Sequence, residues 1–378
     1  MQKKKISVLH SLTDRHIGGA GTWLVSLLST ANQSQFRYGV ILPQNSALIK
    51  RLPKGIDIIP LPIHEKSFCI KDIPLYFRAV KAFQPDILQS HGSLGARIAA
   101  LLASPRAALI VTKHCIFENA TSRHRPLGHI LYTVAAPFTH AAIATADCAA
   151  RALQREGMKR TRIITVKNGA LPCRIPKKSE QDALRRQLGI ENRFVVGFCG
   201  RLEPDKNPLF ILKLASLLRS DGRFFFLVVG DGSLRPQMMH LCKERGLSHR
   251  MHFTGYLDDV SLPLSLFDAQ INCSLLSETS NMALLEGFSL GVPAVASLCG
   301  GNRETVRPGI SGMLYKKNSA VACANCLRRL ASDTALHDTL SRGARQLFEK
   351  EYHSRLMTAR CETFYRALAQ QSTKRIAF

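Results

Sequence analysis

Short apolar runs alternate with amphipathic segments along the whole chain. In the first 170 residues the apolar runs predict strands at 5–10, 39–42, 56–60, 87–89, 108–112, 141–145 and 163–167. The stretches between them predict helices, among them 22–31, 73–82, 94–103 and 147–156. A regular alternation of strand and helix is typical of a parallel sheet that is covered by helices on both faces.

The alternation is interrupted once and then starts again. A polar stretch with two prolines at 171–178 follows an Asn-Gly turn, and we interpret it as a linker. Beyond it, strands are predicted at 194–199, 223–229, 252–254, 269–273 and 292–297, and helices at 208–219, 233–245, 282–290, 320–330 and 354–369. The pattern therefore predicts an α/β protein of two doubly wound, Rossmann-like domains that face each other across a cleft. The predicted domains are 1–170 and 171–355, with a C-terminal helix at 356–378 that packs back on the first domain.

The composition adds a large excess of positive charge. The chain has 52 Lys and Arg against 27 Asp and Glu, which gives a net charge of +25 and a pI near 10.0. Such a surface attracts polyanions, whether nucleic acid, anionic lipid or phosphorylated substrates. The excess is largest per residue in 1–170, which holds 23 Lys and Arg and 8 Asp and Glu. Aromatic residues make up only 7% of the chain, so the stacking platforms of a nucleic-acid-binding protein are scarce.

The cysteines and the N-terminus predict a cytoplasmic protein. The 11 cysteines are scattered and odd in number, which suits a reducing compartment better than a disulfide framework. No signal peptide is recognisable at the N-terminus, and the longest uncharged stretch, 126–146, contains two prolines, so we expect no membrane-spanning helix. The basic first domain favours a peripheral position on the inner face of an anionic membrane.

One segment after a predicted strand has the clearest chemistry. Ser280 or Asn281 is a good N-cap for the helix that follows, so the amides of Ser280, Asn281 and Met282 would lie at a helix N-terminus beside a sheet edge, where phosphate binds. Glu286 lies about 8 Å further along this helix, a separation that suits the ribose hydroxyls of a nucleotide. Glu278 precedes the helix, where it would accept hydrogen bonds from a sugar. The alternative is that both glutamates are ordinary surface carboxylates.

Two cations follow the strand predicted at 194–199. Arg201 and Lys206 lie in a polar turn at the strand end, where a diphosphate would need positive charge. The alternative is a turn with two surface cations. Gly255 follows the strand at 252–254, and its missing side chain would let the backbone approach a nucleotide base.

The first half of the chain has small residues and histidines at its strand ends. Gly18 and Gly19 come after the first predicted strand and before a helix, so the backbone there is able to approach a phosphate or sugar. Their spacing is not that of the dinucleotide-binding fingerprint. His91 and His114 follow two later strands and would point to the same edge of the sheet. The alternative for each histidine is a structural role.

Taken together, these segments resemble the retaining glycosyltransferases of family 4, which have the GT-B architecture. The matching segments, in chain order, are 18–21, 85–92, 167–169, 200–207, 230–232, 252–256, 278–286, 300–304 and 309–312. Glu278 and Glu286 match the two glutamates of the family's E-x7-E motif. The chain departs from the family at Thr279-Ser280-Asn281, where Gly-Phe-Gly is common, so hydroxyl and amide groups face the sugar site.

The resemblance implies a role for each of these residues. Arg201 and Lys206 would hold the donor diphosphate and stabilise charge on the leaving nucleotide. Glu278 would contact the donor hexose and Glu286 the ribose. On the side of the first domain, which would bind the acceptor, Gly18 and Gly19 would line the donor-phosphate and acceptor side and His91 would lie near the donor sugar. The second domain would bind the nucleotide sugar, and the resemblance implies no metal and no cofactor.

The implied activity is transfer of a hexose from a nucleotide-diphosphate sugar, with UDP expected as the nucleotide, and with retention at the anomeric carbon. We expect the acceptor to be a hydroxyl of a lipid-linked or polysaccharide-precursor molecule at an anionic membrane. Two alternatives stay open. One is the same architecture acting on a soluble small molecule, and the other, argued from the pI alone, is a basic nucleic-acid-binding protein.

Overall fold

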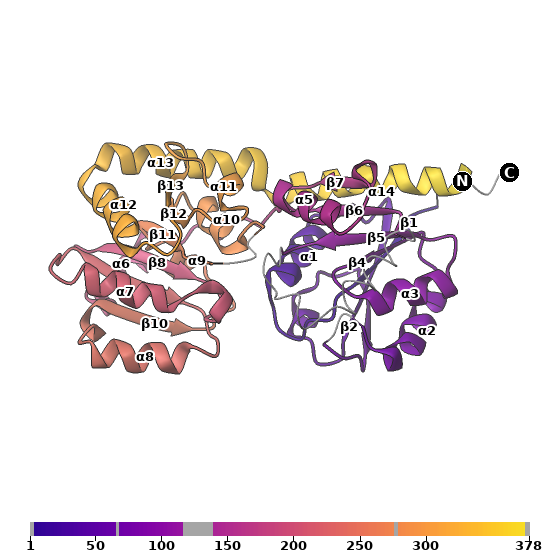
Figure 1. Cartoon of the computed structure of the whole chain (residues 1–378), viewed down its shortest axis with the longest axis horizontal. Coiled ribbons are helices and arrows are strands. Elements are labelled where there is room, and N and C mark those ends of the chain that lie inside the picture. The colour runs from indigo at the N-terminus through magenta and orange to yellow at the C-terminus, as the bar shows by residue number, and fades with distance from the viewer. Residues whose placement is uncertain (1–3, 66–67, 116–138, 276–278, 375–378) are drawn as a thin grey trace. The chain divides into compact units, whose positions relative to one another are not determined.

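The computed structural model describes residues 4–65, 68–115, 139–275 and 279–374. The chain divides into two compact units, and each is described by itself (Figure 1). Unit 1 contains Met1–Ala170 together with Ser354–Phe378, and unit 2 contains Leu171–His353.

Unit 1 is built on a parallel sheet. Its strands are β1 (Ile6–Ser11), β2 (Phe36–Pro43), β3 (Asp57–Leu61), β4 (Ile87–Ser90), β5 (Ala108–Lys113), β6 (Ala141–Ala144) and β7 (Ile163–Thr165). Its helices are α1 (Gly19–Ser29), α2 (Ile73–Phe83), α3 (Leu94–Ala103), α5 (Asp147–Arg155) and α14 (Ser354–Lys374), with single 3-10 turns at Ala47–Arg51, Ile70–Asp72 and Arg160–Arg162. The strand order is β3-β2-β1-β4-β5-β6-β7, and every pair is parallel.

Both faces of the unit 1 sheet are apolar and covered. Successive strand residues point to opposite faces, so Val8 packs in the cluster with α1 and α14 while Leu9 packs in the cluster with α2 and α3. Val40 and Ile41 of β2 divide in the same way. This explains why the strands read as continuous apolar runs instead of alternating ones.

Unit 2 repeats the design with a second parallel sheet. Its strands are β8 (Phe194–Cys199), β9 (Phe224–Val229), β10 (Met251–Gly255), β11 (Ala269–Asn272), β12 (Ala294–Ser297) and β13 (Gly312–Tyr315), in the order β10-β9-β8-β11-β12-β13. Its helices are α6 (Lys178–Leu188), α7 (Leu209–Leu217), α8 (Arg235–Glu244), α9 (Ser261–Leu264), α10 (Met282–Ser289), α11 (Asn302–Thr305), α12 (Ala320–Ser332) and α13 (Thr334–Leu347). Single turns lie at Pro204–Lys206 and Ser248–Arg250, and a short π-helical segment at Phe348–Tyr352.

Each sheet has a topological switch point, where the strand order reverses. It lies between β1 and β4 in unit 1 and between β8 and β11 in unit 2. Ligands of open α/β sheets bind outside the carboxyl ends of the strands at such points. The fold therefore predicts a binding site at the carboxyl ends of β1 and β4 in unit 1 and of β8 and β11 in unit 2.

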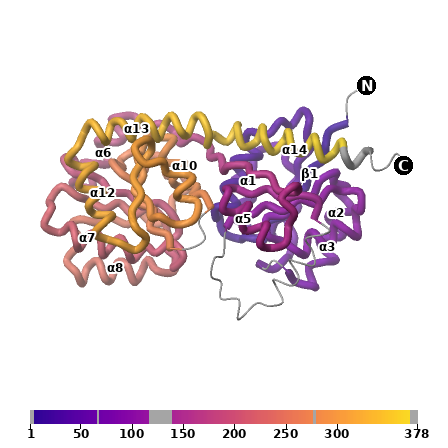
Figure 2. The backbone as a smooth tube through the Cα atoms, turned by 45° about the horizontal axis from the view of Figure 1, so that its top comes forward, coloured from indigo at the N-terminus to yellow at the C-terminus, as the bar shows by residue number. Residues whose placement is uncertain are grey.

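The last helix returns to unit 1. In Figure 2, α14 runs beside α1, and the two helices are joined by a hydrogen bond between the hydroxyls of Thr30 and Thr358 (2.6 Å). The buried carboxylate of Glu362 accepts hydrogen bonds from the Asn32 amide (2.7 Å) and the Tyr38 hydroxyl (3.1 Å). α14 is thus an integral part of the first core.

The predicted fold class of two doubly wound α/β domains is confirmed. Most predicted elements are present with ends shifted by a few residues, but some details were wrong. α1 begins at Gly19, so the glycines expected in a loop before the helix form its N-cap and first turn. β13 and α6 were missed, as were the four-residue helices α9 and α11. In the described part of the chain, no helix combines the length and the apolar character needed to cross a membrane.

Candidate active site

The carboxyl ends of β8, β9 and β10 are held together by glycine backbone. The Gly230 amide donates to the Gly255 carbonyl (2.9 Å), and the Gly200 amide donates to the Val229 carbonyl (3.0 Å). Gly230 has φ +129°, and a Cβ built on it would overlap the Gly200 carbonyl oxygen. Gly255, expected to admit a nucleotide base, is thus used within the protein to tie β10 to the turn after β9.

The turn that carries Arg201 and Lys206 is anchored to the neighbouring strand across the switch point. Asn207 ends the turn in the left-handed conformation (φ 53°), and its side-chain amide donates to the Cys273 carbonyl just after β11 (3.2 Å). The Cys273 thiol in turn donates to the Lys206 carbonyl (3.3 Å). Arg201 is exposed and donates to Asp205 within the same turn (3.2 Å). The two cations therefore sit on a braced turn at the unit 2 switch point.

The α10 N-terminus lies at the same edge of the sheet. Asn281 is its N-cap, and the Asn281 side chain accepts from the Ala283 amide (2.9 Å), as the sequence predicted. Met282 is the first helical residue and is buried, whereas Ser280 is half-buried and precedes the cap. Gly301 packs so closely on this segment that a Cβ there would overlap the Thr279 carbonyl.

Glu286 lies in the second turn of α10 and is half-buried. Its negative charge influences the pKa of two nearby thiols, those of Cys173 and Cys199. Burial, and then the Glu286 carboxylate, raise the pKa of Cys173 to about 12 and raise that of Cys199 well above its usual value. Cys199 is the last residue of β8 and precedes the turn that carries Arg201, so the charge of Glu286 acts at this end of the strand. Glu278 lies outside the described residues.

In unit 1 the predicted glycines lie at the N-terminus of α1. Gly18 is the N-cap and accepts from the Thr22 amide (3.0 Å), and Gly19 is the first helical residue. A Cβ at either position would meet no atom within 4 Å, so these glycines face open space and are not required by packing.

The two predicted histidines of unit 1 lie side by side. His91 follows β4 and His114 follows β5, and His91 Nδ1 is 2.8 Å from His114 Nε2. His91 is 7% exposed and its amide donates to the Ser11 carbonyl of β1 (2.9 Å). A third histidine, His10 of β1, lies beside them and was missed, because its position inside an apolar strand gives no signal in the sequence.

Two carboxylates away from these strand ends have hydrogen-bond partners within the protein. Asp259 accepts from the Ser261 amide at the start of α9 (2.8 Å). His64, Cys69 and Asp72 form a group within 4.8 Å, but Asp72 accepts from both the amide and the ring Nδ1 of His64 (3.0 and 2.8 Å). We interpret this group as a tie between a loop and α2.

Family models cover both units. The model described as "Glycosyltransferase Family 4" matches residues 17–170, and the one described as "Glycosyl transferases group 1" matches residues 180–347.

Similar proteins agree with these matches. The 2-deoxystreptamine glucosyltransferase of Streptomyces kanamyceticus is 30% identical over 271 residues, which cover 66% of this chain and 69% of the relative. The UDP-Gal:alpha-D-GlcNAc-diphosphoundecaprenol alpha-1,3-galactosyltransferase of Escherichia coli is 29% identical over 43% of each chain. Among solved structures, Anabaena Alr3699/HepE in complex with UDP and glucose aligns with a TM-score of 0.79 and 20% identity, over 94% of this chain and 98% of that one. This chain is a glycosyltransferase of the GT-B fold and belongs to family 4.

Proposed function

We propose that the chain transfers a hexose from a UDP-sugar with retention of the anomeric configuration. The observation that carries the proposal is the grouping at the unit 2 switch point, where a braced turn with two cations, a helix N-terminus and a carboxylate lie at one sheet edge. UDP as the nucleotide is supported by the solved complexes of similar fold, which contain UDP, UDP-glucose, or UDP and glucose.

Each group suits one part of a nucleotide sugar. The cations of Arg201 and Lys206 would neutralise the diphosphate as it leaves, and the amides at the α10 N-terminus would bind its oxygens. Glu286 would accept hydrogen bonds from the ribose and Glu278 from the donor hexose. Gly18, Gly19, His91 and His114 are proposed to line the sugar and acceptor side, and Ser280, Asn281, Met282 and Gly255 the nucleotide side.

Catalysis would then rest on charge stabilisation and positioning, without a covalent nucleophile or a metal ion. The acceptor hydroxyl attacks the anomeric carbon from the face that the diphosphate leaves. NMR of the product of an α-linked UDP-sugar should show an α-linkage, and EDTA should leave the rate unchanged. A β-linked product would contradict retention, and loss of turnover in EDTA that Mg²⁺ restores would contradict metal independence.

The diphosphate assignment is tested with single substitutions. Arg201→Ala and Lys206→Ala should each lower kcat by about 10²–10³-fold, the loss typical of removing one transition-state charge donor. Lys213→Ala is the matched control, because Lys213 is an exposed cation on α7 in the same unit. Turnover is measured over a panel of UDP-, GDP- and TDP-sugars, with thermal shifts as the binding readout. Near-normal transfer by both variants would contradict the proposed role of Arg201 and Lys206 in binding the diphosphate.

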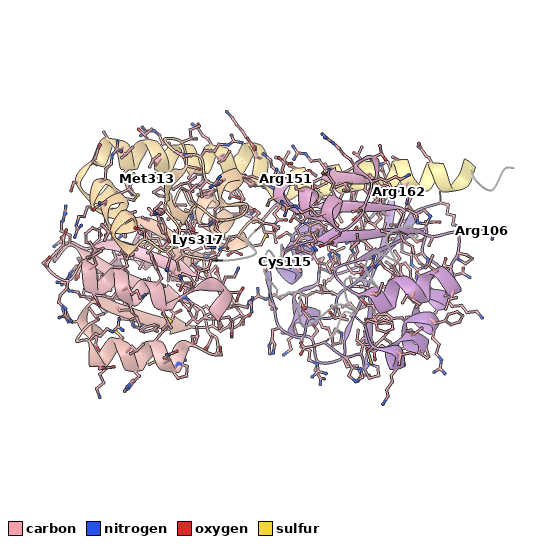
Figure 3. All side chains as sticks on the ribbon, in the orientation of Figure 1. Arg106, Cys115, Arg151, Arg162, Met313 and Lys317 are labelled. Carbon is pink, nitrogen blue, oxygen red and sulfur yellow. The ribbon has the colours of Figure 1, made fainter. Side chains whose placement is uncertain are left out.

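For the acceptor, we propose a lipid-linked or polysaccharide-precursor molecule at an anionic membrane. The surplus of positive charge in unit 1 supports this, and Figure 3 labels three of its exposed arginines, Arg106, Arg151 and Arg162. The Escherichia coli relative is named for a diphosphoundecaprenol-linked acceptor. Binding to phosphatidylglycerol vesicles should exceed binding to phosphatidylcholine vesicles and should weaken as salt is raised.

A small soluble acceptor is the second candidate. It is favoured by the relative named a 2-deoxystreptamine glucosyltransferase, which has the larger matched length. Equal, weak binding to both kinds of vesicle, together with transfer to water-soluble acceptors, would favour a small soluble acceptor over a lipid-linked one.

A further inference from the structure

A cavity of about 400 Å³ opens in unit 1 at the amino ends of its first strands. Lys4 and Lys5, which directly precede β1, line it, and so do Phe36 and Arg37, the first residues of β2. The two strands pair in parallel from Ile6 and Phe36 onward, so the cavity lies at one end of this pair. Substrates of open α/β sheets bind at the opposite, carboxyl ends, so this cavity is a feature separate from the candidate active site.

The charged residues that line this cavity are cations. They are Lys4, Lys5 and Arg37, and none of the described lining residues is acidic. Both lysines are exposed, and in the part of the chain that the structure describes neither forms an ion pair or a side-chain hydrogen bond. A single unpaired lysine is ordinary on a protein surface. Two of them at one cavity concentrate positive charge where no lining carboxylate offsets it, and this attracts an anion.

The third cation, Arg37, is held in place beside the cavity. Its Nε donates to Asp57 (2.8 Å), and its guanidinium lies 4.3 Å from the centre of the Phe83 ring. Its Nη1 also donates to the Phe83 carbonyl at the end of α2 (3.4 Å), which offsets the negative end of a helix that would otherwise repel an anion. The rings of Phe36 and Phe83 are buried, so the lining combines exposed cations with apolar surface.

Gln84 lines the same cavity and has an unusual backbone. It follows α2 with φ 52°, in the left-handed region that favours glycine. Its backbone amide caps the helix by donating to the Val80 carbonyl (2.9 Å), a task for which glycine is the usual residue. The Gln84 side chain is exposed, and its amide group has no hydrogen-bond partner among the described residues. A side-chain donor is therefore kept at the cavity at a position where helix geometry favours glycine.

We propose that this cavity binds a phosphate group, with the ammonium groups of Lys4 and Lys5 as its charge partners and the Gln84 side-chain amide as a neutral donor. A phosphate monoester suits this lining, because it has a charge of about −1.5 to −2 at pH 7 and three strong acceptor oxygens. The phosphate would belong to a soluble molecule or to a lipid headgroup, which these groups would recognise in the same way. No residue of the proposed donor site lines the cavity, so the proposal goes beyond the transferase function.

The soluble source is tested with inorganic phosphate. Amide signals of ¹⁵N-labelled protein are followed in TROSY NMR spectra as sodium phosphate is added, and again with sodium chloride at the same ionic strength. Phosphate should give saturable shifts at Lys4, Lys5 and Gln84, and the Lys4→Ala/Lys5→Ala double variant should bind phosphate about tenfold more weakly. Equal shifts at exposed cations throughout the chain would overturn the proposal, because they would indicate only ordinary counter-ion binding.

The matched control is Lys71→Ala/Arg78→Ala. It removes two exposed cations of the same unit that do not line the cavity, so the net charge falls by the same amount. Its affinity for phosphate should equal that of the natural chain. An equal loss of affinity in both double variants would show that net charge alone attracts phosphate, and would overturn the proposal.

Gln84→Gly separates binding from stability. Glycine adopts the left-handed conformation without strain, so the urea midpoint of unit 1 should rise. The variant lacks the side-chain donor, so its affinity for phosphate should fall about threefold. Unchanged phosphate affinity in Gln84→Gly would overturn the role assigned to this side chain.

Vesicles distinguish the two sources of phosphate. Phosphatidylcholine vesicles that contain phosphatidic acid present the group as a lipid headgroup. For a lipid ligand, the natural chain should bind these vesicles about tenfold more tightly than Lys4→Ala/Lys5→Ala does, and inorganic phosphate should compete. For a soluble ligand, the phosphate titration should saturate while both proteins bind the vesicles equally. If phosphate gives no saturable shifts and the vesicles show no difference, the proposal is wrong. Neither measurement involves sugar transfer, so the outcome is independent of the proposed function.

Discussion

The buried His10 makes the stability of unit 1 depend on pH. Its ring lies between the His91 ring and the ring of Tyr38, whose centroid is 6.0 Å away. Burial lowers the pKa of His10 from 6.5 to about 3, while burial and then Glu362 raise the pKa of Tyr38, so both rings are neutral in the folded chain. On unfolding, His10 regains an ordinary pKa, so the unfolded chain binds a proton that the folded chain does not.

This difference in bound protons sets the direction and the size of the change in stability with pH. Between pH 6.5 and pH 3 the unfolded chain holds more protons, so stability is fully present above pH 6.5 and is lost as the pH falls towards 3. Each pH unit inside the window costs about 1.4 kcal/mol per group, so His10 alone removes about 2 kcal/mol between neutral pH and pH 5. His10→Asn keeps the hydrogen bond to His91 but does not titrate, so it should lose about 2 kcal/mol less than the natural chain over the same interval.

Trp23 provides the assay. It is the single tryptophan of the chain, is fully buried and lies in unit 1, so urea unfolding followed by its fluorescence reports on unit 1. The free energy of unfolding is measured at pH 7.5 and at pH 5 for the natural chain, His10→Asn and the control His16→Asn, which changes an exposed histidine of the same unit. If the natural chain and His10→Asn lose the same stability between pH 7.5 and pH 5, the buried, neutral His10 is not the source of the pH dependence.

Three further substitutions test other parts of the structure. Tyr365→Ala should destabilise unit 1 by about 3–5 kcal/mol, the usual cost of deleting a fully buried aromatic ring, as measured by Trp fluorescence in urea; a cost below 1 kcal/mol would show that α14 is not part of the core. Gly301→Ala should abolish donor binding in a thermal-shift titration, because its Cβ would displace the Thr279 carbonyl ahead of α10, and unchanged affinity would separate this loop from the site. Asn207→Ala should cost about 1–2 kcal/mol in unit 2, since it loses both the bond to Cys273 and a residue suited to positive φ, and no measurable change by hydrogen exchange in unit 2 would contradict that account.

The sheets were predictable because their strands are covered on both faces. Such strands appear as short apolar runs, and β8 was predicted with its true ends for this reason. α6 was missed because none of its residues is fully buried, and only a short apolar stripe that includes Leu184 and Leu188 packs against the core, which is a weak signal in a polar segment. β13 was missed because it has four residues and begins at a glycine.

Some features of the candidate site were likewise predictable from the sequence, and others were not. The Asn281 cap and the turn with Arg201 and Lys206 were predictable, since local spacing alone defines them. His10 was not, because its contact with His91 joins residues 81 positions apart and depends on the strand order at the switch point. Likewise, the use of Gly255 to tie strand ends became visible only with the neighbouring strand in place.

The return of α14 to unit 1 has a consequence for how the chain is made. A ribosome synthesises all of Leu171–His353 before it reaches the helix whose Met357, Cys361 and Tyr365 complete the first core. Until then this core lacks the residues that α14 contributes to it, so we expect the first half of the nascent chain to stay incompletely folded while the second half emerges and folds. A fragment that stops at the linker should accordingly aggregate or recruit chaperones, whereas adding α14 as a separate peptide should rescue its solubility.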